Sequence, residues 1–390
     1  MREGWEYKKL GDVCTIERGG SPRPIADYIT ESADGINWIK IGDAVEGSKY
    51  ILFTKEKIRP EGIKKSRFVH KGDVILSNSM SFGKPYILGI DGCIHDGWLV
   101  LHDNNNTFSK DYLYYVLSSP IMYSKFTQLA VGGVVNNLNS NIVREVVVAI
   151  PPLSTQQSIV SELDKINELI RLKKEQLKDY DNLAQSIFYE MFGDPVVNEK
   201  GWEVKKIGEV CLIERGGSPR PIKDYITEDE DGLNWIKIGD AQEGSIFINS
   251  TKEKIRKEGL KKTRMVHKGD FILSNSMSFG RPYIMGVDGC IHDGWLVLHD
   301  TNNTFNKLYL YYSLAHKSMY QQFKQMAVGG VVNNLNSEMV RRVLVLVPPL
   351  IVQQEFANRI ELIEMQKKQI ISTIQDLETL LASRMQYWFD

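Results

Sequence analysis

The 390-residue chain carries 48 Lys and Arg residues against 49 Asp and Glu residues, so its formal net charge at pH 7 is −1. Hydrophobic residues make up 42% of the chain, which is enough for the cores of two or more ordinary domains. The longest apolar runs are far shorter than a membrane span, and the first residues, MREGWEYKK, lack the apolar core of a signal peptide. We therefore expect a soluble, cytoplasmic protein that does not enter a membrane. A balanced net charge neither favours nor excludes nucleic acid, because binding depends on local charge.

The second half of the chain repeats the first at a constant offset of 197 residues. The segment VGGVVNNLNS occurs at 131–140 and again at 328–337, and ERGGSPRPI, NWIKIGDA and HKGD recur at the same offset. Between residues 65 and 100 the two copies agree at 30 of 36 positions. A period of this length indicates a duplicated domain and not a solenoid.

Each copy ends in a segment with a 4-3 heptad pattern of apolar residues, at 154–192 and 351–389, where only 7 of 39 positions are identical. Both segments follow a Pro-Pro pair, and the first ends at FGDP. The pattern predicts two coiled-coil helices. Antiparallel pairing would place the globular copies at opposite ends of the helices, about a pseudo-twofold axis. The alternative is that each helix packs on its own domain. Lys173, Lys367 and Arg384 interrupt the apolar seam, so we expect them at exposed edges or beside acids.

The globular copies combine short β-rich runs, such as INWIKI and GWLVLHD, with a helical stretch that Pro120 interrupts. The predicted fold class is α+β, with two duplicated α/β domains separated by two long antiparallel helices. The predicted boundaries are 1–153 for the first domain, 154–193 for the central helix, 194–350 for the second domain and 351–390 for the distal helix. Trp38 and Trp98 are expected in the cores.

Catalytic motifs are missing from the sequence. There is no glycine-rich cofactor loop with the motif of a base methyltransferase, and SNSMSFGKP has Pro85 where a phosphate loop needs Ser or Thr. The four cysteines, Cys14, Cys93, Cys211 and Cys290, are expected to be buried thiols. Cys93 and His95 would share one face of a strand, but no fourth ligand lies at a suitable spacing, so no metal site is predicted. The sequence favours a binding protein.

One basic segment occurs in each copy. Residues 55–73 contain seven Lys or Arg against three acids, and residues 252–270 contain eight against three. Such patches suit contact with DNA phosphates, although a solvated loop would have the same composition. The candidate phosphate contacts are Lys64, Lys65, Arg67, Lys261, Lys262 and Arg264.

Polar loops beside these segments carry side chains that suit base edges, because Asn can bond adenine and Arg can bond guanine in bidentate fashion. The candidates in the first copy are Arg18, Ser21, Arg23, Asn78, Ser79, Ser81, Lys84, Asn136, Asn137 and Asn139. Their counterparts in the second copy are Arg215, Ser218, Arg220, Asn275, Ser276, Ser278, Arg281, Asn333, Asn334 and Asn336. The alternative for the Asn residues is a tight turn in which their side chains bond the backbone.

The plan of the chain resembles the specificity (S) subunits of type I restriction-modification enzymes. The resemblance covers the whole chain and depends on GGSPRP near the start of each domain, the GW-x-x-K-x-(L/I)-G opening, and PPL followed by QQ at each helix start. It implies two target-recognition domains that each read one half of a bipartite site in double-stranded DNA, with the helices as spacer. It also implies two adenine methyltransferase subunits and, through them, restriction-translocase subunits as partners, with S-adenosylmethionine and ATP bound by those partners. The family usually pairs dissimilar recognition domains, whereas these two are near copies.

Near-identical domains predict inverted half-sites, and therefore a palindromic or nearly palindromic target with half-site centres about 10 bp apart. Adenine methylation and restriction would be directed to that target, and the chain itself would be non-catalytic. Two alternatives remain at this level. A free-standing bipartite DNA-binding regulator would need no methyltransferase partner, and a self-sufficient methyltransferase or nuclease is disfavoured by the missing motifs.

Overall fold

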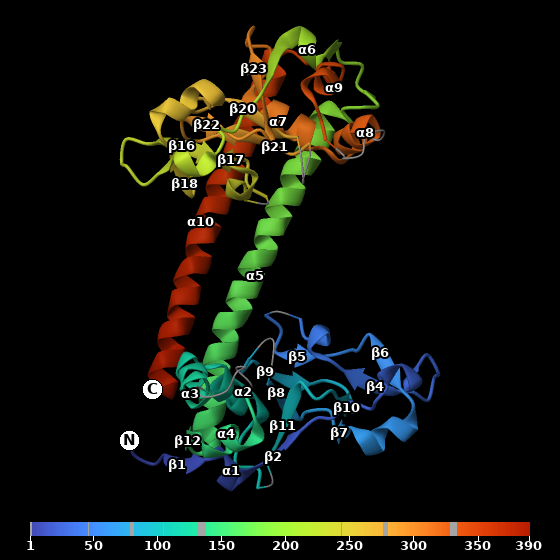
Figure 1. Cartoon of the computed structure of the whole chain (residues 1–390), viewed down its shortest axis with the longest axis vertical. Helices are drawn as coiled ribbons and strands as arrows, with labels where there is room; N and C mark the ends of the chain where they lie inside the picture. Colours follow the sequence, from blue (N-terminus) through green and yellow to red (C-terminus); the bar gives the residue numbers. More distant parts are fainter. Residues whose placement is uncertain are drawn as a thin grey trace. The chain divides into compact units, whose positions relative to one another are not determined.

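The computed structural model describes residues 2–45, 47–78, 82–103, 105–130, 138–242, 244–275, 280–327 and 334–390. The chain is α+β, as predicted, and divides into two compact units, Met1–Lys174 with Ser372–Asp390, and Glu175–Ile371. Each unit therefore contains one sheet-rich copy of the repeat together with part of both long helices (Figure 1).

Before the first long helix, the described residues of the first unit form twelve strands and four short α-helices. The strands are β1 (Glu6–Lys9), β2 (Cys14–Arg18), β3 (Ile29–Thr30), β4 (Ile36–Ile39), β5 (Tyr50–Ile51), β6 (Glu56–Ile58), β7 (Arg67–Val69), β8 (Val74–Ser77), β9 (Pro85–Leu88), β10 (Gly92–Ile94), β11 (Trp98–Asp103) and β12 (Val147–Ile150). The helices are α1 (Leu10–Val13), α2 (Lys110–Ser118), α3 (Pro120–Ala130), α4 (Ser140–Glu145) and the long α5 (Leu153–Phe192).

The second unit repeats this order. Its strands are β13 (Val204–Lys206), β14 (Cys211–Arg215), β15 (Ile226–Thr227), β16 (Leu233–Ile236), β17 (Phe247–Ile248), β18 (Glu253–Ile255), β19 (Arg264–Val266), β20 (Phe271–Ser274), β21 (Pro282–Met285), β22 (Gly289–Ile291), β23 (Trp295–Asp300) and β24 (Leu344–Leu346). Its short α-helices are α6 (Ile207–Val210), α7 (Lys307–Ala315), α8 (Lys317–Ala327) and α9 (Ser337–Arg341). The long helix α10 (Leu350–Phe389) follows and, like α5, belongs in part to each unit.

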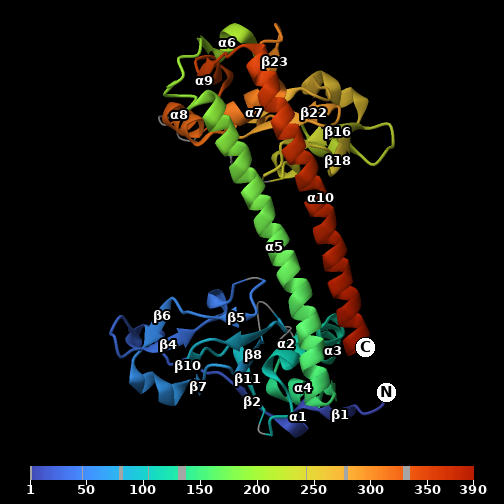
Figure 2. The ribbon, with the colours of Figure 1, turned by 180° about the vertical axis from the view of Figure 1, so that it is seen from behind.

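Two five-stranded sheets form the body of each recognition copy. In the first unit their orders are β2-β11-β8-β9-β5 and β3-β6-β4-β10-β7, and the second unit has the same two orders in its own strands. In both views of the first unit, β4, β6, β7 and β10 lie on the side away from α5, whereas α2, α3 and α4 lie beside α5 (Figures 1 and 2). The first sheet is therefore the layer between the helices and the second sheet.

Alternation along the strands explains why the middle sheet is buried on both faces. Leu99 and Leu101 of β11 pack into the core that faces the helices, while Trp98 and Val100 pack into a second core that faces the other sheet. A strand with two buried faces reads as a continuous apolar run, as WLVLHD does. The expectation that Trp38 and Trp98 are core residues is confirmed, since both are at most 1% exposed.

The two long helices run antiparallel to each other inside each unit. In the first unit, Arg384 Nη2 of α10 donates a hydrogen bond to Glu162 Oε2 of α5 at 3.1 Å, and Lys174 pairs with Glu378 at 2.8 Å. In the second unit, Lys367 pairs with Asp181 at 2.8 Å. Seam residues such as Ile166 and Ile170 are buried, as the heptads predict.

The charged residues on the apolar seam and the C-terminal end of α5 also agree with the sequence pattern. Lys367 and Arg384 meet acids on the partner helix, as expected for charges on an apolar seam. The alternative packing is also partly realised, because Ile159 and Leu163 of α5 belong to the core of the first recognition copy. Helix α5 ends before Gly193, whose φ of 76° suits a helix C-terminus.

Candidate nucleic-acid interface

The turn at Asp96 gathers three segments that lie far apart in the sequence. The backbone carbonyl of Asp96 accepts hydrogen bonds from Arg18 Nε at 2.9 Å and from Asn78 Nδ2 at 2.9 Å. Its carboxylate accepts the Ser21 hydroxyl at 2.9 Å, and Arg23 Nη2 lies 3.6 Å from Oδ2. The structure therefore brings the GGSPRP loop and Asn78 to one place at Asp96. We call this group the Asp96 cluster (Arg18, Ser21, Arg23, Asn78 and Asp96).

The charge of Asp96 is maintained by this setting. Burial alone would raise its pKa, but the hydrogen bond from Ser21 and the positive charges of Arg18 and Arg23 hold the pKa below its ordinary value. The ionised carboxylate of Asp96 can orient the guanidinium of Arg23 by attraction. Because the Arg23 side chain is 83% exposed, most of its five N–H donors still face solvent. Arg23 therefore faces solvent from a loop that the Ser21–Asp96 hydrogen bond holds in place.

Two glycines make the close approach of this loop possible. A Cβ added at Gly19 would lie 2.3 Å from the His95 carbonyl oxygen, and one added at Gly20 would lie 2.8 Å from the Lys65 carbonyl oxygen. Only glycine fits at such separations. The second contact places the GGSPRP loop directly against the basic segment, so the two sets of candidates that sequence separated by about forty residues share one surface.

The basic segment, residues 55–73, contributes exposed cations that differ in the side chains they contact. Lys64 and Lys65 lie at the end of a 3-10 helix, Pro60–Lys65, and both are exposed. Lys65 Nζ donates to Tyr28 OH at 2.6 Å and sits over the Tyr28 ring. Arg67 Nη2 lies 3.3 Å from Glu17 Oε1, so part of its charge is compensated inside the domain. Lys64 and Lys65 are the better placed pair for phosphate contact.

The described Asn candidates differ in exposure and in the backbone groups that they bond. Asn78 and Asn275 are 1% and 2% exposed, so in this conformation their side chains support the Asp96 turn and its counterpart and do not reach a base edge. Asn139 and Asn336 are exposed, but each side-chain oxygen caps a helix by accepting from Ile142 N or Met339 N. A base contact by Asn139 would have to come from its amide nitrogen. This outcome follows the turn alternative, in which Asn side chains bond backbone.

Several candidates lie outside the described residues, namely Ser79, Ser81, Asn136, Asn137, Ser276, Ser278 and Asn333. The neighbouring described residues still locate the ends of these segments. Leu138 N donates to the Asn78 carbonyl at 2.9 Å, and Leu335 N donates to the Asn275 carbonyl at 2.9 Å. Leu138 and Leu335 are therefore bonded directly to the Asp96 cluster and to its counterpart. Lys84 and Asn334 are exposed.

The second copy reproduces the cluster with its own residues. Arg215 Nε donates to the Asp293 carbonyl at 3.0 Å and Asn275 Nδ2 to the same oxygen at 2.9 Å. Ser218 donates to the Asp293 carboxylate at 2.9 Å, and Arg220 lies 3.6 Å from it. The basic pair also recurs, with Lys262 Nζ donating to Tyr225 OH at 2.8 Å beside the exposed Lys261. Arg264 lies 3.2 Å from Glu214, in the way that Arg67 pairs with Glu17 at 3.3 Å. Arg281 stands at the position of Lys84.

Cys93 and His95 have roles inside the domain. Cys93 packs with Trp38 and Ile58, and burial raises the pKa of its thiol to about 11. Burial lowers the pKa of His95, whose Nδ1 accepts from Gly97 N at 2.9 Å. Among the described residues, no three His, Cys, Asp or Glu side chains group as metal ligands.

Asp96 and Asp293 themselves were missed by sequence reasoning. Their signal was the motif HDGW, which recurs at 95–98 and 292–295, but an acid does not look like a DNA contact. An open cleft of about 1030 Å³ borders Asp96 and is lined by Ser21, Arg23, Trp38, Lys40 and Glu56, among others. Arg23 and Asp96 both line this cleft, and the guanidinium donors of Arg23 can hold an edge of a planar polar group.

Comparison with known proteins agrees with this architecture. Residues 2–179 and 199–378 each match the family described as Type I restriction modification DNA specificity domain. Because the two matches cover most of the chain, the chain belongs to this family. It is a specificity subunit with two repeated recognition domains, the DNA-recognition component of a type I system and not a catalytic one.

The relatives are distant. The putative type I restriction enzyme MjaX specificity subunit of Methanocaldococcus jannaschii is 23% identical over 405 residues, covering 94% of this chain and 89% of the relative. The MjaIX specificity subunit of the same organism is 26% identical over 63% of this chain, and the match spans only 61% of that relative's length. The predicted family resemblance is thus confirmed over the length of the chain.

Solved structures share the fold. A chain from work on complex assembly and conformational transition of the type I R-M system has a TM-score of 0.67 at 20% identity, covering 99% of this chain and 97% of its own. The type I S subunit from M. genitalium has a TM-score of 0.54 at 13% identity, covering 99% and 96%. In the part of the chain that the structure describes, no helix has the length and apolar character to cross a membrane.

Proposed function

We propose that the chain reads a bipartite site in double-stranded DNA, with one half-site for each recognition domain. The observation that carries this proposal is the duplication of one contact set at matching distances. Ser21 and Ser218 each donate to their aspartate at 2.9 Å, and Arg23 and Arg220 each lie 3.6 Å from it. Two domains that present the same donors in the same geometry should read the same bases.

The half-sites are then inverted copies, and the target is a palindromic or nearly palindromic sequence with an unread gap. The antiparallel pairing of the two helices inside each unit supports the inversion. Half-site centres about 10 bp apart would present the same face of B-DNA to both domains. The exchange of Lys84 for Arg281 is the difference most able to change one base, since only Arg offers a planar fork for guanine.

The partners in this proposal are two adenine methyltransferase subunits per chain and, through them, restriction subunits in the cytoplasm. Exposed apolar residues on the long helices support a protein partner there: Leu172 is 46% exposed on α5, and Leu362 and Met365 are 64% and 65% exposed on α10. The domain limits that we propose remain 1–153 and 194–350 for the recognition domains, with 154–193 and 351–390 as spacer helices.

Methylation mapping tests the proposal. The chain is co-expressed with a type I methyltransferase subunit from the same organism in a host without modification. Modified adenines are then located by single-molecule sequencing. We expect one interrupted, near-palindromic motif with one methylated adenine on each strand. Two unrelated half-sites would refute the inverted arrangement. Specific DNA binding without any co-purifying methyltransferase would instead support the free-standing regulator.

A further inference from the structure

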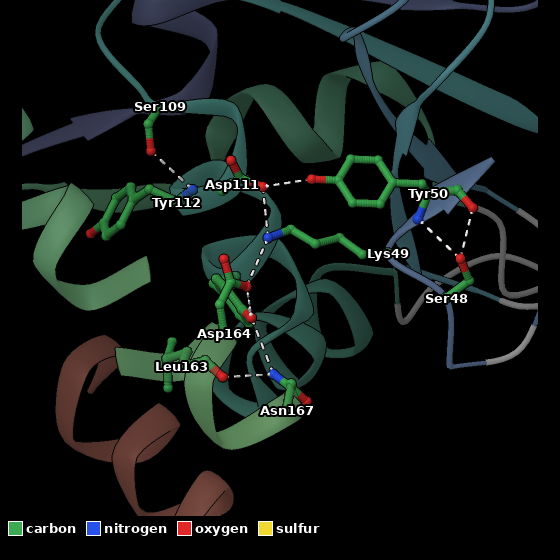
Figure 3. Close-up of polar contacts among 10 residues, drawn as sticks. Ser48, Lys49, Tyr50, Ser109, Asp111, Tyr112, Leu163, Asp164 and Asn167 are labelled. Carbon is green, nitrogen blue, oxygen red and sulfur yellow. Dashed lines mark hydrogen bonds and ion pairs between the residues drawn. The ribbon is translucent and has the colours of Figure 1, made fainter. Parts of the chain in front are cut away.

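The cation Lys49, directly before strand β5, joins the first recognition copy to helices α2 and α5. Its Nζ lies 2.6 Å from Asp111 Oδ1 on α2 and 3.0 Å from Asp164 Oδ1 on α5, and Figure 3 shows the amine between these two carboxylates. The Lys49 side chain is only 15% exposed. A lysine held by two carboxylates at low exposure fixes the elements that carry them.

Tyrosines complete the junction. Tyr115 OH donates to Asp164 and accepts from Asn167 Nδ2 at 3.1 Å, and Tyr50 OH donates to Asp111 at 3.2 Å. Burial, followed by the hydrogen bond to Asp164, raises the pKa of Tyr115, so its hydroxyl keeps its proton as a donor. Lys49 also lies 4.8 Å from the centre of the Tyr115 ring. The contacts from Asp164 and Asn167 all belong to α5, the spacer helix.

The backbone of Lys49 ties this junction to the sheet. Its carbonyl accepts from Ile87 N at 2.9 Å, beside the pairing of β5 with β9. Strand β9 pairs with β8, which ends at Ser77 directly before Asn78, the supporting residue of the Asp96 cluster. A continuous series of contacts therefore connects helix α5 through Lys49 to the sheet whose strand β8 leads to Asn78.

The second copy has apolar residues where the first copy has Lys49 and Asp111. Ile246 and Leu308 stand at the positions of Lys49 and Asp111, and they are 4% and 8% exposed. The buried cation there is Lys367, which comes from α10 and pairs with Asp181 and Glu364 on the helices themselves. This contrast occurs although the recognition loops of the copies are almost identical.

We propose that Lys49 is a positioning residue that fixes the orientation of the first recognition domain on helix α5 and so selects the spacing between half-sites. The inference rests on the proposed bipartite function. Directional ion pairs and charge-assisted hydrogen bonds define an angle more narrowly than apolar contacts, which tolerate small rotations. The first domain is then held to the spacer by charge and the second by packing.

The test uses the full-length chain in complex with its methyltransferase and duplexes that carry the mapped site at its natural spacing or one base pair longer or shorter. The variants are Lys49→Met, which removes the charge and keeps the stem, and Lys49→Arg, which keeps the charge. Ile246→Met is the matched control at the same position of the second copy. Asp164→Asn is a second route to the same loss if Lys49→Met fails to fold.

We expect Lys49→Met to reduce the preference for the natural spacing by roughly 3- to 10-fold, and Lys49→Arg and Ile246→Met to retain it within about 2-fold. Discrimination against single base changes inside a half-site should stay as in the unmodified chain. An equal loss of affinity at every spacing would mean that Lys49 only stabilises the fold and would overturn the proposal, as would an unchanged preference. If the unmodified chain shows no bipartite site, the proposed function itself has failed.

Discussion

Ser21 donates its hydroxyl hydrogen to Oδ1 of Asp96 at 2.9 Å, and Ser218 makes the same bond to Asp293 at the same distance. This pair anchors the GGSPRP loop to the turn that also receives Arg18 and Asn78. Its recurrence means that the two halves of the chain can be perturbed separately at one matched position. The tests of the arginines and lysines below compare matched positions of the two copies.

Arginine at the rim of the cluster should contribute to sequence selectivity. We expect Arg23→Ala to weaken binding to the cognate site by about 1 to 3 kcal/mol, because the 83% exposed guanidinium is available to a base edge. Arg220→Ala should have a similar effect. Competition binding with cognate and random duplexes measures both, with Arg171→Ala on helix α5 as control. Equal losses on the two duplexes would contradict base reading and would assign Arg23 to phosphate contact.

The exposed lysines should act on all DNA alike. We expect Lys64→Ala, and Lys261→Ala in the second copy, to lower affinity for cognate and random DNA in parallel. Each change should also reduce the slope of log affinity against log salt by about 1, since one phosphate contact is lost. Arg67→Ala should change the slope less, because Arg67 already pairs with Glu17. Salt titrations of binding would reject this ranking if Arg67→Ala had the larger effect.

Acidification should loosen the turn at His95. Burial lowers the pKa of His95 in the folded chain, so its neutral form is favoured, and Nδ1 accepts from Gly97 N. An unfolded histidine gains its proton near pH 6.5, before the folded one does, so stability is lost as the pH falls from about 6.5 through the folded pKa. We expect Tm to fall less steeply over this range in His95→Asn than in the unmodified chain. Parallel curves would show that His95 does not contribute.

Lys367 should stabilise the second unit through its two acids. Its side chain is 11% exposed and lies 2.8 Å from both Asp181 and Glu364. Lys367→Ala leaves these carboxylates without that cation and should lower the free energy of unfolding by about 1 to 3 kcal/mol. The first copy suggests a compensating pair of substitutions, because Ile170 and Asn167 occupy the positions that correspond to Lys367 and Glu364. Denaturant midpoints should recover most of the loss in K367I/E364N, and no recovery would mean that the charge itself is required.

A fragment of residues 1–193 should self-associate through α5. It contains one recognition copy and the whole helix, and the buried seam of Ile166, Ile170 and Phe188 would be uncovered in a monomer. Pairing of two fragments would place Ile187 where Arg384 meets Glu162, so the dimer should be weaker than the native helix pair. Sedimentation equilibrium over a wide concentration range measures the association. A fragment that stays monomeric at high concentration would contradict the prediction.

The sequence by itself determined the duplication, the α+β class, the two long helices and the family. Heptads and Pro-Pro starts located α5 and α10, because a helix that buries one stripe must repeat its apolar residues at a fixed period. GGSPRP and the basic segment marked the candidate surface, because charge and turn chemistry are local properties of the chain. These features need no knowledge of which residues meet in space.

Tertiary structure decided which polar residues support the surface and which remain available to DNA. Asn78 resembles a base contact in sequence, yet it is 1% exposed and donates to the Asp96 carbonyl. Asp96 and Lys49 gave no signal as single letters, since their roles depend on partners 75 and 115 residues away along the chain. Burial and hydrogen-bond partners are set by contacts between distant segments, and a local pattern carries no information about them.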